Sequence, residues 1–242
     1  MKNFKVSYSY PLEHPIKVVI NKLNRQGLVG WLFQKYGRNI QPGNLIITER
    51  IIELPTLHEW LGKIFSKPEG DILEIGHVAS STSLELASLG FNITGIDLRE
   101  YPFVHKNLKS FKGDFLTQKF EDKFDCIFSL STIEHFGFSK RYGGEDDPSN
   151  KQDEEAFTKI ATLLKSSGHA IISVPYAQNW IEGVWFRVYT RIDLKNKLEK
   201  DFRIIEERFY KRTKGNWSPV LDPSADPVLP YDGVALFLLR NK

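Results

Sequence analysis

Short apolar runs alternate with amphipathic stretches along residues 70–175, and this alternation constrains the fold more than any other feature of the chain. Four runs have the length and composition of buried strands: 72–76, 91–97, 124–130 and 169–175. Residues 80–90 and 153–168 place apolar side chains at helical spacing, and each stretch ends on a glycine. Strands that alternate with helices are typical of βαβ units. We therefore predict an α/β fold with a doubly wound, mostly parallel sheet.

The carboxyl-terminal third of the chain predicts a different arrangement. Thr190 and Asp193 have the spacing of a capping box and indicate the start of a helix. Residues 202–212 alternate as in a half-buried strand. A Pro-rich loop separates this strand from a last apolar run, 234–240. We therefore expect the sheet to end in an antiparallel strand pair.

The amino-terminal region differs from the rest of the chain in charge. Residues 1–43 contain seven Lys and Arg side chains and a single acid, Glu13. Residues 16–37 are amphipathic, so they could lie on a membrane, on a partner or across the mouth of an active site. Their broken apolar face would hold a membrane only weakly, so we favour a lid or an oligomer contact. We expect a helical extension or lid at 1–68 and the α/β domain at 69–242.

Composition limits the functional classes. Apolar residues make up 41% and charged residues 26% of the 242 positions, as in folded, water-soluble proteins. The net charge of +3 comes without a dense Lys/Arg block, so no nucleic-acid partner is expected. The single cysteine, Cys126, lies in an apolar run and predicts a buried thiol in a reducing compartment. No apolar stretch approaches the roughly 20 residues that span a bilayer, so we expect a cytoplasmic protein without stable membrane insertion.

Ligands of open parallel sheets bind beyond the carboxyl ends of the strands, where the strand order reverses. The first loop of this kind begins at Gly76, and Asp97 follows about 20 residues later, at the end of the second predicted strand. A carboxylate there can accept hydrogen bonds from both hydroxyls of a ribose. The same spacing suits a nicotinamide dinucleotide. Alternatively, Gly76 only makes the strand-to-helix turn and Asp97 caps the residues that follow it.

Motifs later in the chain help to distinguish a nicotinamide dinucleotide from other cofactors that contain a ribose. Gly113-Asp114-Phe115 is followed by FDCIFSLSTIEHFG, and this order resembles the class I S-adenosylmethionine-dependent methyltransferases, which have a Rossmann-like fold. The resemblance covers about residues 72–175 and the last strand pair. It is closer to bacterial methyltransferase-like proteins with an S-x-IEH-x-G-x-x-RYGD signature, here STIEHFGFSKRYGGEDDP, which are associated with polysaccharide biosynthesis. It implies S-adenosylmethionine as the cofactor, with its ribose on Asp97 and its adenine amino group on Asp114.

The resemblance implies a cofactor site at the carboxyl ends of several strands. The candidate cofactor-binding residues at this edge are Glu74, Gly76, His77, Ser80, Asp97, Leu98, Asp114, Phe115, Ser129 and Leu130. The first loop departs from the family, because His77, Val78 and Ala79 stand where further glycines are usual. Hydroxyl groups at 80–82 could compensate by binding the methionine carboxylate. One alternative is a non-catalytic binding subunit. A nicotinamide-dependent oxidoreductase is less favoured, because the loop lacks the later glycines of G-x-G-x-x-G and no Tyr-x-x-x-Lys pair follows the third strand.

His135 is the candidate general base, because an imidazole titrates near neutral pH and this one follows the third predicted strand. In the alternative, Glu134 and His135 only hold the junction after that strand. The resemblance implies O-methylation of a small-molecule or glycan-like acceptor. Its candidate contacts are Arg141, Tyr142, Arg187 and Tyr189. Three acids at 145–147 are interpreted as solvated surface, so no metal is expected. A homo-oligomer is possible, with the amino-terminal segment as the contact between copies.

Overall fold

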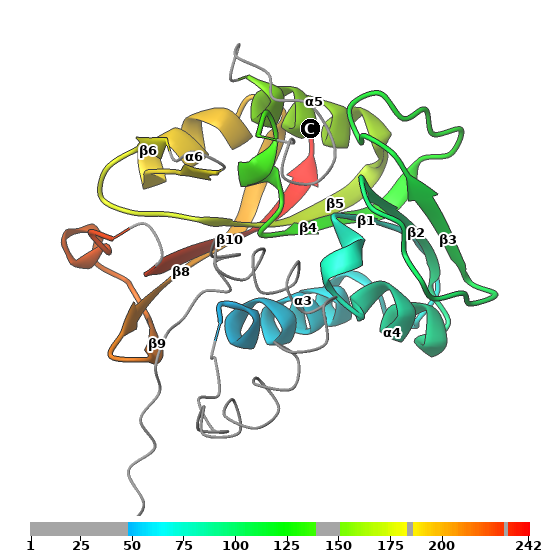
Figure 1. Ribbon diagram of the computed structural model, residues 1–242, viewed down its shortest axis with the longest axis horizontal. Helices are drawn as coiled ribbons and strands as arrows, with labels where there is room; N and C mark the ends of the chain where they lie inside the picture. Colours follow the sequence, from blue (N-terminus) through cyan, green and yellow to red (C-terminus); the bar gives the residue numbers. More distant parts are fainter. Residues whose placement is uncertain (1–47, 139–150, 183–185, 230–231) are drawn as a thin grey trace, which may run out of the picture. The chain divides into compact units, whose positions relative to one another are not determined.

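The computed structural model describes residues 48–138, 151–182, 186–229 and 232–242 (Figure 1). Within them, eight strands form one sheet in the order β3-β2-β1-β4-β5-β10-β8-β9. These strands are β1 (Asp71–Ile75), β2 (Asn92–Asp97), β3 (Leu108–Lys112), β4 (Phe124–Leu130), β5 (Leu164–Pro175), β8 (Phe202–Thr213), β9 (Asn216–Pro219) and β10 (Gly233–Asn241). The short strands β6 (Ile181–Glu182) and β7 (Arg187–Val188) pair with each other outside this sheet. The described helices are α3 (Arg50–Ile64), α4 (Thr82–Leu89), α5 (Gln152–Leu163) and α6 (Arg191–Leu198), with short 3₁₀ turns η3 (His77–Ala79), η4 (Ile133–His135) and η6 (Pro223–Ala225).

The order of the strands reverses at β1. From β1 the chain adds β2 and β3 on one side and then β4 and β5 on the other, all of them parallel. β10 then enters antiparallel between β5 and β8. The predicted Rossmann-like sheet, mostly parallel and ending in antiparallel strands, is therefore confirmed. The reversal point lies between β1 and β4, which is where sheets of this kind bind ligands.

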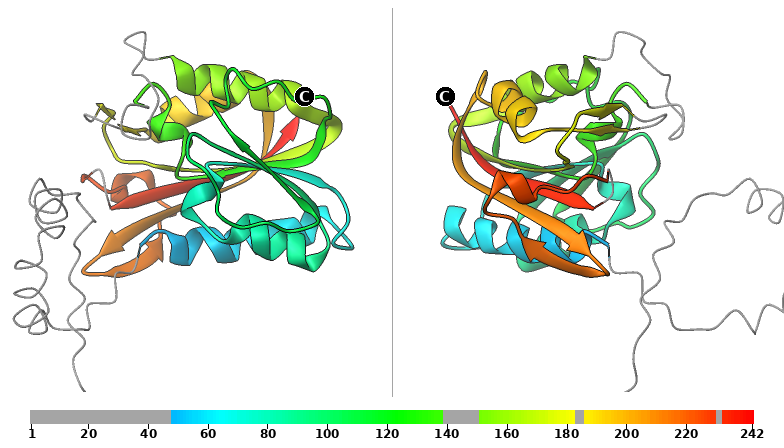
Figure 2. Two further views of the ribbon diagram at one scale, coloured as in Figure 1. Left: turned by 45° about the vertical axis from the view of Figure 1, so that its right-hand side comes forward. Right: turned by 90° about the vertical axis from the view of Figure 1, so that its left-hand side faces the viewer.

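Helices cover both faces of the sheet, with α3 and α4 on one face and α5 and α6 on the other (Figures 1 and 2). Alternate residues of a strand point to opposite faces, so each central strand contributes to two cores. Ile72 of β1 packs in the same core as Trp60 of α3. Its neighbour Leu73 packs in the core that contains Phe157 of α5. The sheet is therefore buried on both sides, and its exposed loops lie at the ends of the strands.

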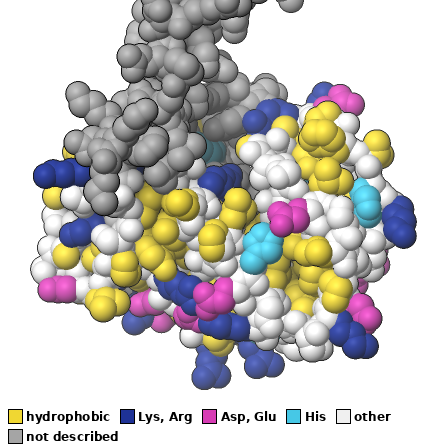
Figure 3. Space-filling view, turned by 90° about the horizontal axis from the view of Figure 1, so that it is seen from below, with side chains coloured by type: hydrophobic (Ala, Val, Ile, Leu, Met, Phe, Trp, Pro, Cys, Tyr) yellow, Lys and Arg dark blue, Asp and Glu magenta, His cyan; other side chains and the backbone are white. Residues whose placement is uncertain are grey.

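Helix α3 packs against the sheet although it lies within the predicted extension at 1–68. Lys63 of α3 lies 2.9 Å from Glu59 and 2.8 Å from Glu206 of β8. Figure 3 looks onto the side of α3 and α4 and shows charged side chains among apolar ones. The chain divides into two compact units, Met1–Ile51 and Ile52–Lys242. Residues 1–47 lie outside the described residues, so the lid stays a prediction. None of the described helices has the length and apolarity to cross a membrane.

Some elements differ from the sequence-based expectation. The helix expected at 153–168 ends at Leu163, and Leu164 begins β5 with extended backbone (φ −75°, ψ 143°). The Ser-Ser-Gly sequence that follows has low helix propensity, and the side chain of Leu164 is fully buried in the core. Three elements, β3, β9 and α3, are not predicted from the sequence. β3 is an edge strand of mostly exposed and half-buried residues, and α3 contains Pro55, so neither shows a clear pattern.

Candidate functional site

Loops at the carboxyl ends of β1 and β4 meet beside the reversal point of the sheet (Figure 1). Gly76 makes the turn after β1 with a φ of 85°, and its N–H donates to the carbonyl of Ile96 at 2.8 Å. A Cβ at this position would lie 2.3 Å from Oγ1 of Thr132, which follows β4. Glycine is therefore required both for the turn and for the close approach of the two loops.

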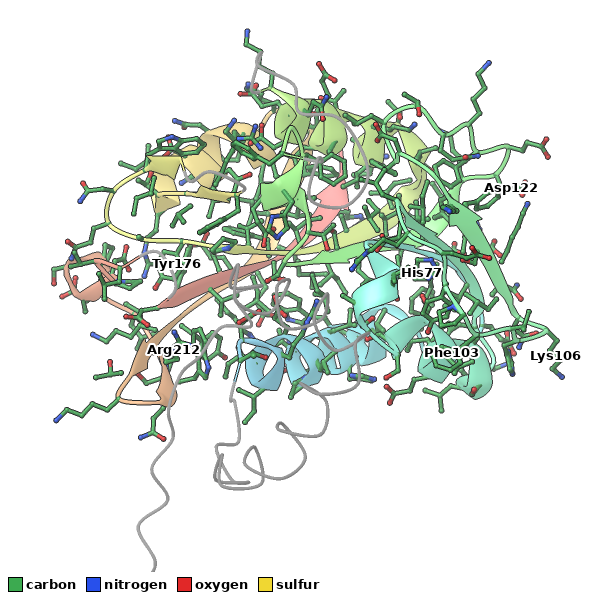
Figure 4. The ribbon with its side chains drawn as sticks, in the orientation of Figure 1. His77, Phe103, Lys106, Asp122, Tyr176 and Arg212 are labelled. Carbon is green, nitrogen blue, oxygen red and sulfur yellow. The ribbon has the colours of Figure 1, made fainter. Side chains whose placement is uncertain are left out.

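The side chain of His77 is directed into the fold, over β2 and β3 (Figure 4). Its ring lies 4.4 Å from the ring of Tyr101, and its Nε2 lies 3.1 Å from Ser110 Oγ. A Cβ on Gly95 of β2 would lie only 2.3 Å from His77 Nδ1. A glycine on the neighbouring strand thus provides the space for the imidazole. Burial lowers the pKa of His77, so the ring is neutral near pH 7.

Glu74, at the end of β1, is buried and accepts hydrogen bonds from residues at the start of α4 and just before it. Its Oε1 accepts a hydrogen bond from Ser80 Oγ at 2.8 Å, and its Oε2 accepts one from Ser83 Oγ at 2.5 Å. Ser80 was predicted to offer its hydroxyl to the cofactor. In this structure that hydroxyl donates to Glu74, so the loop between β1 and α4 is closed on itself. The cofactor roles of both residues stay predictions.

Asp97, at the end of β2, is a buried carboxylate that is fully used as an acceptor. Oδ1 accepts from the backbone N–H and the Nε of Arg99, both at 2.9 Å. Oδ2 accepts from Arg99 Nη2 at 2.9 Å and from the N–H of Val78 at 3.2 Å. Burial alone would raise the pKa of Asp97, but the hydrogen bonds and charge of Arg99 hold it below its usual value. Asp97 is therefore ionised, and the Val78 contact ties β2 to the first loop.

Asp114 follows β3 and lies in the loop next to the end of β2. The N–H of Gly113 donates to the carbonyl of Asp97 at 2.9 Å, and Asp114 Oδ1 accepts from the N–H of Leu116 at 2.8 Å. Lys159 of α5 anchors this loop, because its Nζ donates to the carbonyls of three loop residues at 2.6 to 2.8 Å. Phe115 is buried and Leu98 half-buried. The structure thus brings the predicted ribose and adenine acids to adjacent strand ends.

The end of β4 contains a feature that the sequence analysis missed. Ser129 and Leu130 are buried as expected of a central strand, and Ser131 then takes a left-handed conformation with a φ of 44°. Ser131 Oγ donates to Oε1 of Glu53 at 2.5 Å, and Ser173 Oγ of β5 donates to the same oxygen at 2.5 Å. Glu53 belongs to α3 and has no exposed surface. A buried carboxylate therefore fixes the strained turn after β4.

His135 lies in the 3₁₀ turn that follows β4 and is half-buried. Its Nε2 lies 3.9 Å from Oε1 of Glu134, whose side chain is buried, and its ring centre lies 6.3 Å from that of Phe186. The turn places an imidazole next to a carboxylate at the same edge of the sheet as Asp97. This position allows His135 to act as a base, and that role stays a prediction.

The predicted acceptor contacts that the structure describes are interior residues. Arg187 and Tyr189 have no exposed surface. Arg187 Nη1 donates to the carbonyl of Phe136, and Tyr189 OH donates to Asp153 Oδ2 at 3.1 Å. Burial and the nearby Asp153 raise the pKa of Tyr189 well above its usual value. These contacts connect β7 to the turn after β4 and to α5. Arg141, Tyr142 and the acids at 145–147 lie outside the described residues.

A surface hollow of about 830 Å³ lies at the opposite end of the parallel strands, where Lys106 and Asp122 line it (Figure 4). None of the residues predicted to bind the cofactor lines this hollow. Among the residues that the structure describes, no group of His, Cys, Asp and Glu side chains could hold a metal ion.

Comparisons with known proteins address the family and the fold. Residues 73–172 match the family described as a methyltransferase domain. The comparison with curated proteins gave no match. Among solved structures, the chain is similar to a 1,6-didemethyltoxoflavin-N1-methyltransferase of Burkholderia thailandensis with bound 1,6-didemethyltoxoflavin and S-adenosylhomocysteine. The two are 14% identical, the TM-score is 0.55, and the match covers 97% of this chain and 93% of the other.

Two further similar structures show that this fold occurs in enzymes with different reactions. The N-methyltransferase NodS of Bradyrhizobium japonicum, in complex with S-adenosylhomocysteine, is 16% identical with a TM-score of 0.54, and the match covers 87% of this chain and 97% of NodS. The [4+2]-cyclase SpnF is 14% identical with a TM-score of 0.53, and the match covers 77% of this chain and 80% of SpnF. Residues 73–172 thus match a methyltransferase domain, and both of the similar N-methyltransferase structures contain S-adenosylhomocysteine. The cyclase shows that fold alone does not determine the reaction.

Proposed function

We propose that the protein is an S-adenosylmethionine-dependent methyltransferase that acts at an oxygen atom of a small-molecule or glycan-like acceptor. The observation that carries the proposal is the Gly76 turn beside a buried, ionised Asp97, at the ends of two adjacent parallel strands. The glycine lets the loops after β1 and β4 come together beside this acid, and the carboxylate can accept ribose hydroxyls. The methyltransferase-domain match supports this assignment. A non-catalytic subunit is not favoured, because His77 is directed into the fold.

Each part of the cofactor has candidate contacts in this proposal. Asp97 would hold the ribose, Asp114 the adenine amino group, and Ser129 with Leu130 the methionine part. The cofactor supplies a methyl group on a positively charged sulfur. The protein has to align an acceptor with that methyl group, exclude water and remove the acceptor's proton.

His135 is the group that we propose removes this proton. Its neighbour Glu134 lies 3.9 Å away and would stabilise the imidazolium that forms. An oxygen acceptor follows from the sequence resemblance, whereas the two similar enzymes described above are N-methyltransferases. A lid formed by the amino-terminal segment, a cytoplasmic location and a role in polysaccharide biosynthesis belong to the same proposal.

Calorimetry with S-adenosylmethionine and S-adenosylhomocysteine tests the cofactor assignment. Asp97→Ala removes an acceptor of two ribose hydroxyls, each worth roughly 1.5–3 kcal/mol, so Kd should rise by about two to four decades. Asp97→Asn should be intermediate, because an amide offers one acceptor oxygen and no charge. Asp125→Asn is the matched control, since this acid pairs with Lys165 at the amino end of β4. Equal affinities for wild type and Asp97→Ala would contradict the proposal.

Methyl transfer to panels of hydroxyl and amine acceptors tests the chemistry. With a hydroxyl acceptor, His135→Ala should lower kcat by about 10²–10⁴-fold, which is the usual contribution of a general base, while the Kd of the cofactor changes little. His169→Gln, within β5, is the control for loss of a histidine elsewhere. If His135→Ala turns over at the wild-type rate, His135 only holds the turn after β4.

A further inference from the structure

The hydrogen bonds on Asp97 leave no room for the ribose. An ionised carboxylate has about four acceptor sites on its two oxygens. Four donors already fill them: two from the backbone, Val78 N–H and Arg99 N–H, and two from the Arg99 guanidinium. A ribose that donates both of its hydroxyls would need two of these sites. Some of the present donors must therefore leave before the ribose can bind.

The guanidinium is the donor that can leave. The Val78 N–H belongs to the turn after β1, which requires Gly76. The Arg99 N–H is part of the backbone that continues directly from β2. The side chain of Arg99 is 41% exposed, whereas that of Asp97 is 5% exposed. A long, half-exposed side chain can rotate into solvent without moving the backbone.

The backbone after Arg99 is held independently of the ion pair. Tyr101 packs on the ring of His77 at 4.4 Å, and its hydroxyl donates to the carbonyl of Ser80 at 3.4 Å. Two residues beyond Arg99, the loop is thus tied to the turn after β1. Rotation of the Arg99 side chain would leave the cofactor loop in place.

We propose that Arg99 is an internal competitor of the cofactor: its guanidinium occupies the ribose position on Asp97 and lowers the affinity for adenosyl ligands. This inference rests on the proposed function. In the absence of a ligand, the pair keeps a buried carboxylate ionised and hydrogen-bonded. When a ligand binds, the ribose hydroxyls replace two guanidinium donors, and the cation moves into water. The measured affinity thus reflects the free energy of ribose binding minus the free energy lost when the Arg99–Asp97 pair is broken.

Calorimetric titration of the full-length protein with S-adenosylhomocysteine tests this proposal. Arg99→Gln should bind about two- to fivefold more tightly than wild type, because a partly exposed ion pair changes an equilibrium by at most about fivefold. Arg99→Lys keeps the charge without the paired donors and should lie between the two. Lys112→Gln is the matched control: it removes a positive charge from the residue paired with Asp97 on β3, but no hydrogen bond to Asp97.

Salt provides a second readout. Added salt weakens the Arg99–Asp97 pair, so it should favour binding of the uncharged ribose to wild type more than to Arg99→Gln. Tighter binding of Arg99→Gln with a reduced salt effect supports the competitor. Unchanged or weaker binding of Arg99→Gln overturns it, and so does an equal gain in Lys112→Gln, which would indicate a general charge effect. If neither wild type nor any variant binds the ligand, the proposed function itself fails. A wild type that binds through Asp97 without a gain in Arg99→Gln refutes only the competitor.

Discussion

The contact between His77, in the turn η3 after β1, and Gly95 of β2 predicts a strong coupling between these two positions. A Cβ at position 95 would lie 2.3 Å from His77 Nδ1 and 2.6 Å from two ring carbons, whereas real Cβ contacts begin above 3 Å. The imidazole has no exposed surface and packs against Tyr101, so it cannot move aside without disturbing the cofactor loop. We therefore expect Gly95→Ala to displace the ring and destabilise the fold.

The magnitudes follow from the packing. Overpacking a buried site usually costs about 1–3 kcal/mol, and the backbone of Gly95 needs no positive φ that would add strain. His77→Ala removes a buried ring and should cost about 2–4 kcal/mol, as other large-to-small core substitutions do. In the double variant the new methyl group enters the space that the ring has left. There Gly95→Ala should be neutral or stabilising by up to about 1 kcal/mol, because alanine restricts the unfolded chain.

Urea unfolding of the four proteins in this double-mutant cycle measures the coupling. We expect the double variant to be more stable than the sum of the single changes by about 1–4 kcal/mol, with an unchanged m value. Gly95→Ala alone should also weaken cofactor binding, because displacement of His77 shifts the loop that follows β1. Additive free energies, or a Gly95→Ala protein as stable as wild type, would refute the placement of the imidazole over β2.

Other parts of the structure give further predictions. Burial lowers the pKa of His77 below its ordinary 6.5, so the unfolded chain binds a proton before the folded protein does as pH falls. The free energy of unfolding should therefore decrease below about pH 6.5. Urea midpoints measured against pH should fall less steeply in His77→Ala than in wild type. Burial raises the pKa of the Cys126 thiol, so a thiol reagent should label the native protein only at the rate of unfolding. Asp226 accepts from Arg191 at 2.7 to 2.9 Å in a pair with little exposed surface; Asp226→Ala should cost about 2–4 kcal/mol, visible as a lower Tm, and an unchanged Tm would contradict a buried pair.

Local patterns were sufficient to predict the framework of the fold. The strands expected at 72–76 and 124–130 match β1 and β4 to within a residue, because central strands are apolar throughout. The capping box at the start of α6 is present, with Thr190 Oγ1 accepting from the N–H of Asp193 and Asp193 Oδ2 accepting from the N–H of Thr190. These features depend on neighbours in the sequence, which a single chain displays directly.

Contacts between distant segments could not be predicted in this way. Glu53 is 78 residues from Ser131 and 120 from Ser173, and an acid in the first turn of a helix usually faces water. The fit of His77 over Gly95 likewise requires the register of β1 and β2. The missing glycines of the first loop can be read directly from the sequence, but the glycine that compensates for them, Gly95, lies on β2. Such complementary pairs become visible only when the sheet is assembled.

The buried carboxylates near this edge of the sheet differ in the donors that satisfy them. Glu53 and Glu74 each accept from serine hydroxyls, and one donor of each, Ser173 or Ser83, has no exposed surface. Replacing such a donor would remove one hydrogen bond from a buried acid, at a cost of about 1–3 kcal/mol, so these two acids hold loops. Asp97 instead receives two of its hydrogen bonds from a half-exposed guanidinium, which water can solvate when it leaves. Replacing a protein donor by a ligand hydroxyl therefore costs the least free energy at Asp97. This difference is a physical reason to assign the ligand to Asp97 rather than to Glu53 or Glu74.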